Sequence, residues 1–334
     1  MDKTTFRILD TLTRDFGTPV SINELKNRID KTYGSAYYKN IYDKVKDLEN
    51  EGILNLENVG KSKSISLNFN HKTISLLGEM EKNKLSEIIK NTRFSQFFEN
   101  VENQTRGLYI SISSIKSIKN LSLNRAELLI LNFQQEELYT LIKKLESKTS
   151  IKIDPLILSR QEFLDILTSK EYNPLKTMLK DQTTIIKPDD FWTTIAEKDT
   201  NIFYEEEKEL PLSETNLIYN LNRFGYREIG EKIQESEKIC LELIIADILI
   251  SGTSRKKEAI PILLSKNKAS YPLLFFLCKK YNKLDVLLGF LRALNKIKST
   301  REVENTIKIL ENIGTEEKKV DYKPIKEKMD LYGG

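Results

Sequence analysis

The sequence predicts an α+β protein of several domains: a helical N-terminal domain closed by a short hairpin, a small α/β middle domain and an all-helical C-terminal domain. The first observation is length, because 334 residues exceed the usual size of one domain. The second is that helix-spaced and strand-spaced apolar residues alternate up to about position 200, whereas only helical spacing follows Ser213. The third is the acidic run at 205–209, which precedes Pro211 and has the composition of a solvated boundary.

Breaks in these patterns place the domain boundaries. The boundary between the first two domains is the softer one, because helical spacing continues through it. We expect an N-terminal domain over 1–77, a connecting helix over 78–104, the middle domain over 105–200, a basic helical domain over 211–320 and a tail over 321–334.

Composition excludes several classes of site. His71 is the only histidine, so H-E-x-x-H zinc sites and His-rich metal centres, which need at least two histidines, cannot be built. Cys240 and Cys278 lie 38 residues apart with no second cysteine near either, which excludes a zinc ribbon and suits a reducing cytoplasm. No stretch approaches 18 uninterrupted apolar residues, and the charged start lacks the apolar core of a signal peptide. We therefore expect a cytoplasmic protein with no metal site, no cofactor and no membrane partner.

The first 70 residues predict three helices followed by a two-stranded hairpin. Ser21 and Glu24 form a capping box at the start of the second helix. The third helix is expected from Ser35 to Glu51, and Gly52 ends it. Alternating strands at 53–56 and 64–69 then flank a polar turn. The apolar residues at helical spacing are Phe6, Leu9, Leu12 and Phe16 in the first helix, Ile22, Leu25 and Ile29 in the second, and Tyr37, Ile41, Val45 and Leu48 in the third.

This stretch resembles the winged-helix domains of prokaryotic DNA-binding proteins, chiefly in the segment Asp47 to Leu54, which matches their recurring L-E-x-x-G-h-h pattern. The resemblance implies that the third helix enters the major groove and that the hairpin, or wing, touches the backbone. The residues expected to face nucleic acid are Ser35, Tyr38, Lys39 and Tyr42 on the helix and Lys61 and Lys63 on the wing. The alternative is a protein-docking or homodimer module, because residues 1–82 carry a net charge of only about +1.

The middle segment resembles the small nucleotidyltransferase domains of the polymerase-beta superfamily over about residues 105–195. The similarity lies first in the order of elements, which are strands at 108–112 and 128–132, a helix at 136–148 and a strand at 151–158. It lies second in three short motifs, Gln161-Glu162-Phe163, Asn173-Pro174-Leu175 and the strand before Phe191-Trp192, which follow in the family's order.

The chemistry of that family is missing from the aligned positions. Its members hold two magnesium ions with a G-S turn, an S-D-x-D strand and a third carboxylate. Aligned without gaps, Ser113-Ser114 replaces the Gly-Ser pair and Ile118 the following glycine, so side chains obstruct the approach of a triphosphate. Asn-Arg-Ala-Glu at 124–127 replaces S-D-x-D, which puts a cation, Arg125, where the first metal-binding aspartate belongs.

The remaining acids of this site are Glu127 and Asp154, which we expect to be solvated or paired with Arg125. We therefore expect a degenerate domain and no enzyme. The alternatives are an unrelated α/β domain and an active nucleotidyltransferase with rearranged carboxylates.

The C-terminal helices carry excess positive charge. Between Ser251 and Lys298, eleven Lys or Arg stand against two acids, a net charge of +9 in a chain of +4. Aromatic residues are interleaved with these bases, as is typical of contacts with a nucleic-acid backbone. The alternatives are ordinary solvated helix ends, or docking against an acidic surface such as the chain's own 205–209. The candidate contacts are Arg255, Lys256, Lys257, Lys279, Lys280 and Lys283.

The combination resembles archaeal proteins that join a winged helix to a nucleotidyltransferase-like domain. It implies a non-catalytic nucleic-acid-associated factor of the transcriptional-regulator type, with DNA as the first choice of partner. The second hypothesis is an RNA- or ribosome-binding factor that uses the basic C-terminal helices, and the third is an active nucleotidyltransferase.

Overall fold

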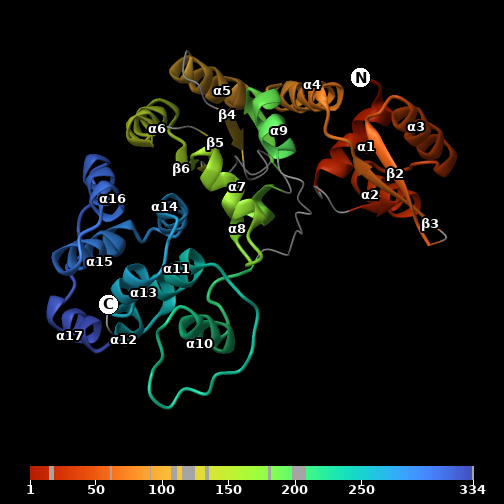
Figure 1. Cartoon of the computed structure of the whole chain (residues 1–334). Coiled ribbons are helices and arrows are strands. Elements are labelled where there is room, and N and C mark those ends of the chain that lie inside the picture. The colour runs from red at the N-terminus through yellow and green to blue at the C-terminus, as the bar shows by residue number, and fades with distance from the viewer. Residues whose placement is uncertain are drawn as a thin grey trace. The chain divides into compact units, whose positions relative to one another are not determined.

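The protein is a mixture of helices and small sheets in which helices predominate, as the sequence predicts for the α+β class. Figure 1 shows the computed structural model, which describes residues 1–14, 19–60, 62–90, 92–106, 111–114, 125–131, 135–179, 182–197 and 208–332. The chain divides into two compact units. Unit 1 comprises Met1–Asn132, Ser159–Thr168 and Leu175–Glu205, and unit 2 comprises Phe133–Leu158, Ser169–Pro174 and Glu206–Gly334.

Unit 1 opens with three helices and a three-stranded antiparallel sheet. The strand order is β1-β3-β2, with Val20 opposite Ile65 and Leu54 opposite Leu67. Ser21 caps the second helix, because its hydroxyl accepts a hydrogen bond of 3.1 Å from the Glu24 N–H. The elements are α1 (Lys3–Arg14), β1 (Val20–Ser21), α2 (Ile22–Tyr33), α3 (Tyr38–Asn50), β2 (Leu54–Val59) and β3 (Ser62–Leu67).

Most of the expected helical stripes form the core here; Phe6 is only half-buried, Phe16 lies outside the described residues, and Tyr37 departs furthest from the expectation. Leu9, Leu25 and Val45 are fully buried, one from each helix. Tyr37 was expected in the stripe of the third helix, but it is 72% exposed. The helix begins at Tyr38 rather than Ser35, and Tyr37 is its N-cap in an extended conformation, so its side chain does not follow the helical face of Ile41.

The stretch 78–104, expected as one connecting helix, contains two. These are α4 (His71–Ile88) and α5 (Thr92–Thr105). The first starts earlier than expected because Asn70 caps it, accepting a hydrogen bond of 3.0 Å from the Thr73 N–H.

The rest of unit 1 is built on antiparallel strands with helices packed on them. β4 pairs with β5, where Ser111 lies opposite Leu131, and with β7, where Ser114 lies opposite Thr183. Helix α4 packs against α9 and β7. The elements are β4 (Ser111–Ser114), β5 (Arg125–Leu131), α7 (Arg160–Thr168), α8 (Pro174–Met178), β7 (Thr183–Ile186) and α9 (Pro188–Ala196).

Unit 2 is helical apart from one strand, within the part of it that the structure describes. Helix α14 packs against α11 and β6, and the rings of Phe275 and Tyr139 meet with centroids 4.5 Å apart. The elements are α6 (Gln135–Thr149), β6 (Lys152–Leu158), α10 (Glu214–Arg223), α11 (Leu241–Ser251), α12 (Ser254–Lys257), α13 (Ile260–Lys266), α14 (Tyr271–Lys280), α15 (Leu284–Ile297), α16 (Arg301–Asn312) and α17 (Tyr322–Tyr332).

Two segments of unit 2 differ from the expectation. The sequence pattern indicates a helix over 229–250, but the helix covers only Leu241–Ser251. Residues before it are held extended, because Tyr172 exchanges backbone hydrogen bonds with Lys238 and Cys240. The expected tail contains α17, which buries Ile325 and Met329. Over the described residues, no helix has the length and apolar character needed to cross a membrane.

Candidate nucleic-acid interface

Of the predicted interface residues of unit 1, Tyr38, Lys39 and Tyr42 lie on α3 and Lys63 lies on β3, whereas Ser35 lies in the turn before α3. Ser35, Lys39 and Lys63 are exposed, Tyr38 is 47% exposed and Tyr42 is half-buried. The sixth predicted residue, Lys61, lies outside the described residues. Helix α3 buries Ile41, Val45 and Leu48; Tyr38 and Tyr42 flank this buried stripe, and Lys39 lies farther round towards the outward side.

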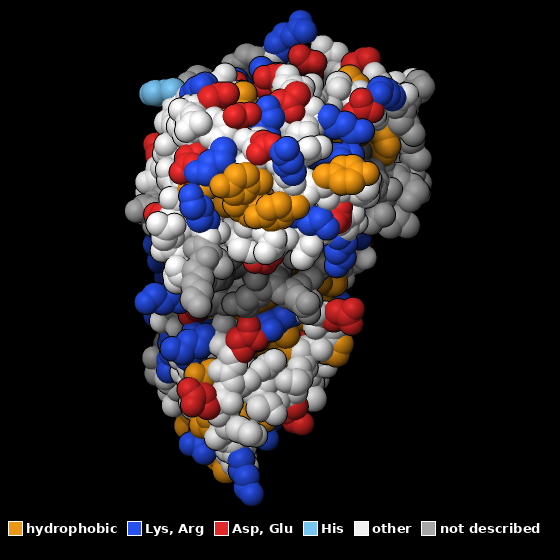
Figure 2. All heavy atoms as spheres, turned by 90° about the vertical axis from the view of Figure 1, so that its right-hand side faces the viewer, with side chains coloured by type: hydrophobic (Ala, Val, Ile, Leu, Met, Phe, Trp, Pro, Cys, Tyr) orange, Lys and Arg blue, Asp and Glu red, His pale blue; other side chains and the backbone are white. Residues whose placement is uncertain are grey.

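Aromatic rings are grouped on this surface. Tyr38 and Tyr42 are four residues apart and therefore lie one above the other, with ring centroids 6.1 Å apart and an angle of 22° between the planes. Tyr37 precedes them and is more exposed than either. Figure 2 views the molecule from the side that carries α3 in Figure 1, and hydrophobic side chains there lie among those of Lys and Arg.

Lys46 also belongs to this surface, although the sequence reasoning missed it. Its Nζ lies 2.5 Å from Glu49 Oε2. Hydrogen bonding to Glu49 raises the pKa of Lys46, while the neighbouring Lys46 amine lowers the pKa of Lys63. The signal in the sequence was spacing, because Lys46 follows Tyr42 by four residues, as Tyr42 follows Tyr38. The surface formed by Tyr37, Tyr38, Lys39, Tyr42, Lys46 and Lys63 is called the α3 aromatic surface below.

The basic residues predicted in unit 2 are partly neutralised by acids of the same unit. Arg255 Nε lies 3.5 Å from Glu228 Oε1, and Lys279 Nζ lies 3.0 Å from Glu146 Oε1. Lys280 lies over the Tyr281 ring at 5.8 Å from its centroid. The other three, Lys256, Lys257 and Lys283, are half-buried.

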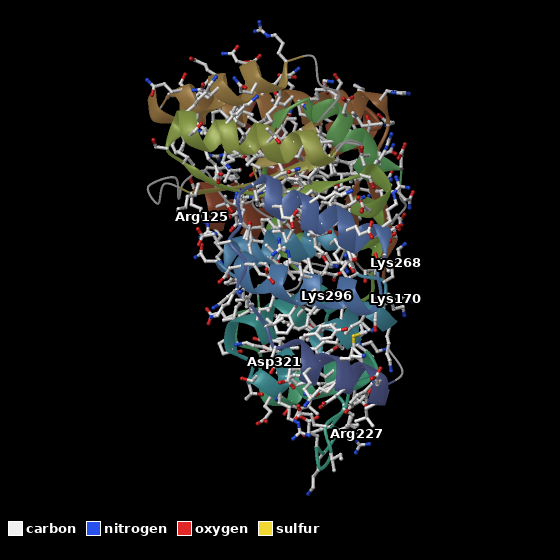
Figure 3. The ribbon with its side chains drawn as sticks, turned by 90° about the vertical axis from the view of Figure 1, so that its left-hand side faces the viewer. Arg125, Lys170, Arg227, Lys268, Lys296 and Asp321 are labelled. Carbon is white, nitrogen blue, oxygen red and sulfur yellow. The ribbon has the colours of Figure 1, made fainter. Side chains whose placement is uncertain are left out.

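The charge of the whole C-terminal part is correspondingly modest. Residues 206–334 carry a net charge of +3, because the acids on either side of 251–298 offset much of its +9. Exposed bases that were not among the predicted contacts include Lys268 and Lys296, which are labelled in Figure 3. The contacts of Tyr38 with Tyr42 and of Lys46 with Lys63 thus join α3 and β3 into one surface, whereas Arg255 and Lys279 of the C-terminal part are engaged in ion pairs.

The acids at the positions aligned with the nucleotidyltransferase metal site are buried, so of the two expected states, solvated or paired with Arg125, the solvated one is wrong. Glu127 on β5 is 8% exposed and Asp154 on β6 is 1% exposed. Arg125 begins β5 and is half-buried (Figure 3). Ser113 and Ser114 lie in β4, whereas Ile118 and Asn124 fall outside the described residues. Among the residues that the structure describes, no group of three or more His, Cys, Asp or Glu side chains could hold a metal ion.

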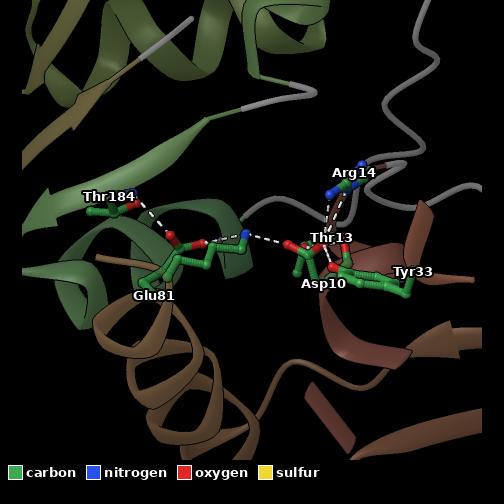
Figure 4. Close-up of polar contacts among 7 residues, drawn as sticks. Asp10, Thr13, Arg14, Tyr33, Glu81 and Thr184 are labelled. Carbon is green, nitrogen blue, oxygen red and sulfur yellow. Dashed lines mark hydrogen bonds and ion pairs between the residues drawn. The ribbon is translucent and has the colours of Figure 1, made fainter. Parts of the chain in front are cut away.

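Unit 1 contains a buried ionic cluster that the sequence reasoning did not find (Figure 4). Asp10 of α1 is 1% exposed and receives a hydrogen bond from the Tyr33 hydroxyl. Its carboxylate lies 2.8 Å from Arg14 Nη2 and 2.5 Å from Lys84 Nζ. Lys84 lies 3.4 Å from Glu81 Oε1, and the other oxygen of Glu81 accepts a hydrogen bond of 3.0 Å from the Thr184 N–H.

Within the cluster, the pKa of Asp10 is lowered, whereas the pKa values of Glu81 and Lys84 are raised. Burial opposes ionisation of Asp10, but the charges of Lys84 and Arg14 hold the pKa of Asp10 below its usual value. Burial raises the pKa of Glu81, and Lys84 only partly offsets this. Burial acts against the ammonium of Lys84, yet Glu81 and Asp10 raise the pKa of Lys84. These contacts connect α1 and α2 to α4 and β7 within unit 1.

No family model, no curated protein and no solved structure matches this chain.

Proposed function

We propose that this protein is a non-catalytic, nucleic-acid-associated factor that contacts DNA through an N-terminal winged helix, in the manner of a transcriptional regulator. The observation that carries the proposal is the α3 aromatic surface. It combines exposed aromatic rings and lysines on the outward side of a helix that is followed directly by a hairpin.

The order of elements in unit 1 supports the winged-helix interpretation. Helices α2 and α3 are separated by only four residues and form the helix-turn-helix pair, while β2 and β3 form the wing and β1 adds a third strand. In such a domain the second helix of the pair lies in the major groove and the wing reaches the phosphate backbone. Tyr38 and Lys39 then face the groove, and Lys63 faces a phosphate.

We also propose that residues 105–200 are a degenerate nucleotidyltransferase-like domain. The order of strands and helices from β4 to α9 supports this interpretation, and the position of Arg125 in the aligned metal site speaks against catalysis. RNA or ribosome binding by unit 2 has less support, because Arg255 and Lys279 are already engaged with carboxylates of unit 2.

Fluorescence anisotropy of the full chain with labelled DNA tests the DNA-binding proposal. The combined substitution of Tyr38, Lys39 and Lys63 by alanine should weaken DNA binding by at least about tenfold, or about 1.4 kcal/mol. All three side chains are at least partly exposed, so the midpoint of thermal unfolding should not change. The matched control is Lys82→Ala, which removes an exposed lysine of α4 in the same unit.

Two results are decisive. Weaker binding by the triple variant with unchanged binding by Lys82→Ala supports the proposal. Unchanged DNA affinity in the triple variant overturns it and assigns the domain to protein docking.

A further inference from the structure

We infer that the α3 aromatic surface binds unpaired bases, so that the preferred DNA is single-stranded or locally opened rather than an intact duplex. This inference rests on the proposed function for the contact of this surface with DNA, and it replaces docking of α3 in the major groove of an intact duplex by stacking of Tyr37 and Tyr38 on unpaired bases. It is drawn from the exposure of the rings, from their arrangement and from the small number of charges beside them.

Exposure is the first observation. Tyr37 is 72% exposed and Tyr38 is 47% exposed, the two highest values among the aromatic side chains of the described part of unit 1. Nearby, Ile41, Val45 and Leu48 bury the inner side of α3, so these rings are surplus to the core. An aromatic ring supplies a large, rigid contact area with few rotatable bonds, and its flat face suits a nucleobase.

The arrangement of the rings is the second observation. Tyr38 and Tyr42 are held nearly parallel, at an interplanar angle of 22°. Tyr42 is half-buried, so it limits the positions that the Tyr38 ring can adopt. A ring that is ordered before binding loses less conformational entropy when a base stacks on it.

Charge is the third observation, and it distinguishes unpaired from paired DNA. The surface offers three lysines, Lys39, Lys46 and Lys63, and Glu49 neutralises one of them. Two or three phosphate contacts correspond to a salt dependence with a slope of only about −1.4 to −2.1 on a single strand. Such a weak electrostatic contribution leaves stacking as the main source of affinity. Base faces are accessible to a protein ring only where the duplex is open.

Anisotropy titrations of the full chain with a labelled single strand, the corresponding duplex and the same duplex with an unpaired bubble test the inference. The wild-type chain should bind the single strand and the bubble more tightly than the duplex. Tyr37→Ala and Tyr38→Ala should each weaken binding to the single strand by about 5- to 140-fold, the range that corresponds to about 1–3 kcal/mol per stacked base. Their effect on the duplex should stay below about twofold.

The conservative variants Tyr37→Phe and Tyr38→Phe keep the ring and should retain the affinity for the single strand. The control is Ile89→Ala, which shortens an exposed apolar side chain elsewhere in unit 1 and should change neither affinity. Because Tyr37 and Tyr38 are exposed, the unfolding midpoint of each variant should match that of the wild type.

The possible failures are distinguishable. If the chain binds duplex as tightly as single strand, and Tyr→Ala weakens both equally, the stacking inference is overturned while DNA binding stands. Loss of binding in the Phe variants also overturns it, because the hydroxyl rather than the ring would then make the contact. If no oligonucleotide binds at all, both the inference and the proposed function are overturned.

Discussion

Asp10 is ionised in the interior of unit 1 because its neighbours supply both positive charge and hydrogen bonds. Lys84 and Arg14 approach one carboxylate, and Tyr33 donates its hydroxyl hydrogen to the same group. A buried ion pair adds little net stability compared with well-packed apolar residues, yet removing one partner is costly because the other charge stays buried. Lys84 contacts both acids, Asp10 and Glu81, so its removal should destabilise unit 1 more than removal of any other member of the cluster.

Lys84→Met should therefore lower the free energy of unfolding by about 3 kcal/mol, at the lower end of the range for a broken buried pair because Arg14 remains beside Asp10. Trp192, the only tryptophan of the chain, lies buried in unit 1, so its fluorescence during urea unfolding reports on this unit. Lys82→Met, two residues earlier at an exposed position of the same helix, should change the free energy by less than about 0.5 kcal/mol. Equal effects of the two substitutions would show that the cluster does not stabilise unit 1.

The contribution of Asp2 to the stability of the fold should depend on pH. Its carboxylate accepts hydrogen bonds from the Thr5 N–H at 2.9 Å and from the Thr5 hydroxyl at 2.7 Å, and it lies 3.1 Å from Lys44 Nζ. Partial burial acts to raise the pKa of Asp2, but these hydrogen bonds and Lys44 bring it from 3.8 down to about 2. A carboxyl whose pKa is lower in the folded than in the unfolded state stabilises the fold at any pH above its unfolded-state pKa. For Asp2 this stabilisation is lost as the pH falls from 3.8 towards 2.

Asp2→Ala should accordingly lower the free energy of unfolding by about 1 kcal/mol at pH 7, the typical value for a lost helix cap. The difference between variant and wild type should shrink when the same urea titration is repeated near pH 3. A difference that stays constant with pH would mean that the ionised carboxylate is not what stabilises the start of α1.

Helix α3 with its neighbour β3 and the basic helices of unit 2 differ in how their lysines are paired. On the α3 aromatic surface, Lys39 of α3 and Lys63 of β3 are exposed, and Lys46 pairs with Glu49, an acid of the same helix. In unit 2, Arg255 and Lys279 pair with acids that lie far away in the sequence. A base that is already paired must lose that partner before it can neutralise a phosphate, so it contributes less to salt-dependent binding.

The salt dependence of nucleic-acid binding separates these groups of bases. Substituting Lys256, Lys257 and Lys283 by glutamine should flatten the plot of log K against log salt concentration by up to about two units, at about 0.7 per phosphate of a single strand. Substituting the paired Arg255 and Lys279 should flatten it much less. Glutamine has a helix propensity close to that of lysine, so the helices should be retained. If neither group changes the slope, the +9 segment is a solvated surface without a nucleic-acid partner.

Whether the chain as a whole can catalyse nucleotide transfer depends on the residues around its aligned metal-site positions. The proposed alignment with nucleotidyltransferases puts Glu127 and Asp154 at metal-ligand positions, and both are buried. It puts Arg125 at the position of the first aspartate, where a guanidinium would repel the magnesium ions that nucleotide transfer requires.

The pure protein should therefore neither transfer a labelled nucleotide to an acceptor nor gain thermal stability from Mg-ATP. Incorporation assays with labelled ATP and thermal unfolding with and without Mg-ATP measure the two properties. Incorporation that disappears in both Glu127→Ala and Asp154→Ala, while each variant stays folded, would establish an active nucleotidyltransferase instead.

Local patterns in the sequence determined those helices and strands that depend only on residues a few positions apart. The apolar stripes of α1 and α2, the cap at Ser21, the hairpin after Gly52 and the helical nature of unit 2 all depend on spacing and on residues a few positions apart. The single histidine and the separated cysteines likewise exclude classes of site without any structure. For the same reason, the outward residues Tyr38 and Lys39 of α3 could be named in advance.

Only the tertiary structure decided what depends on residues far apart in the chain. Thr184 donates to Glu81 across 103 positions, and Lys84 reaches Asp10 from another helix. The extended segment before α11 is held by Tyr172, and the burial of α17 requires the helices it packs on. A periodic pattern specifies which face of an element is apolar but not which partner covers it. It could therefore place Tyr37 on the inner side of a helix, whereas the turn between α2 and α3 leaves that ring in solvent.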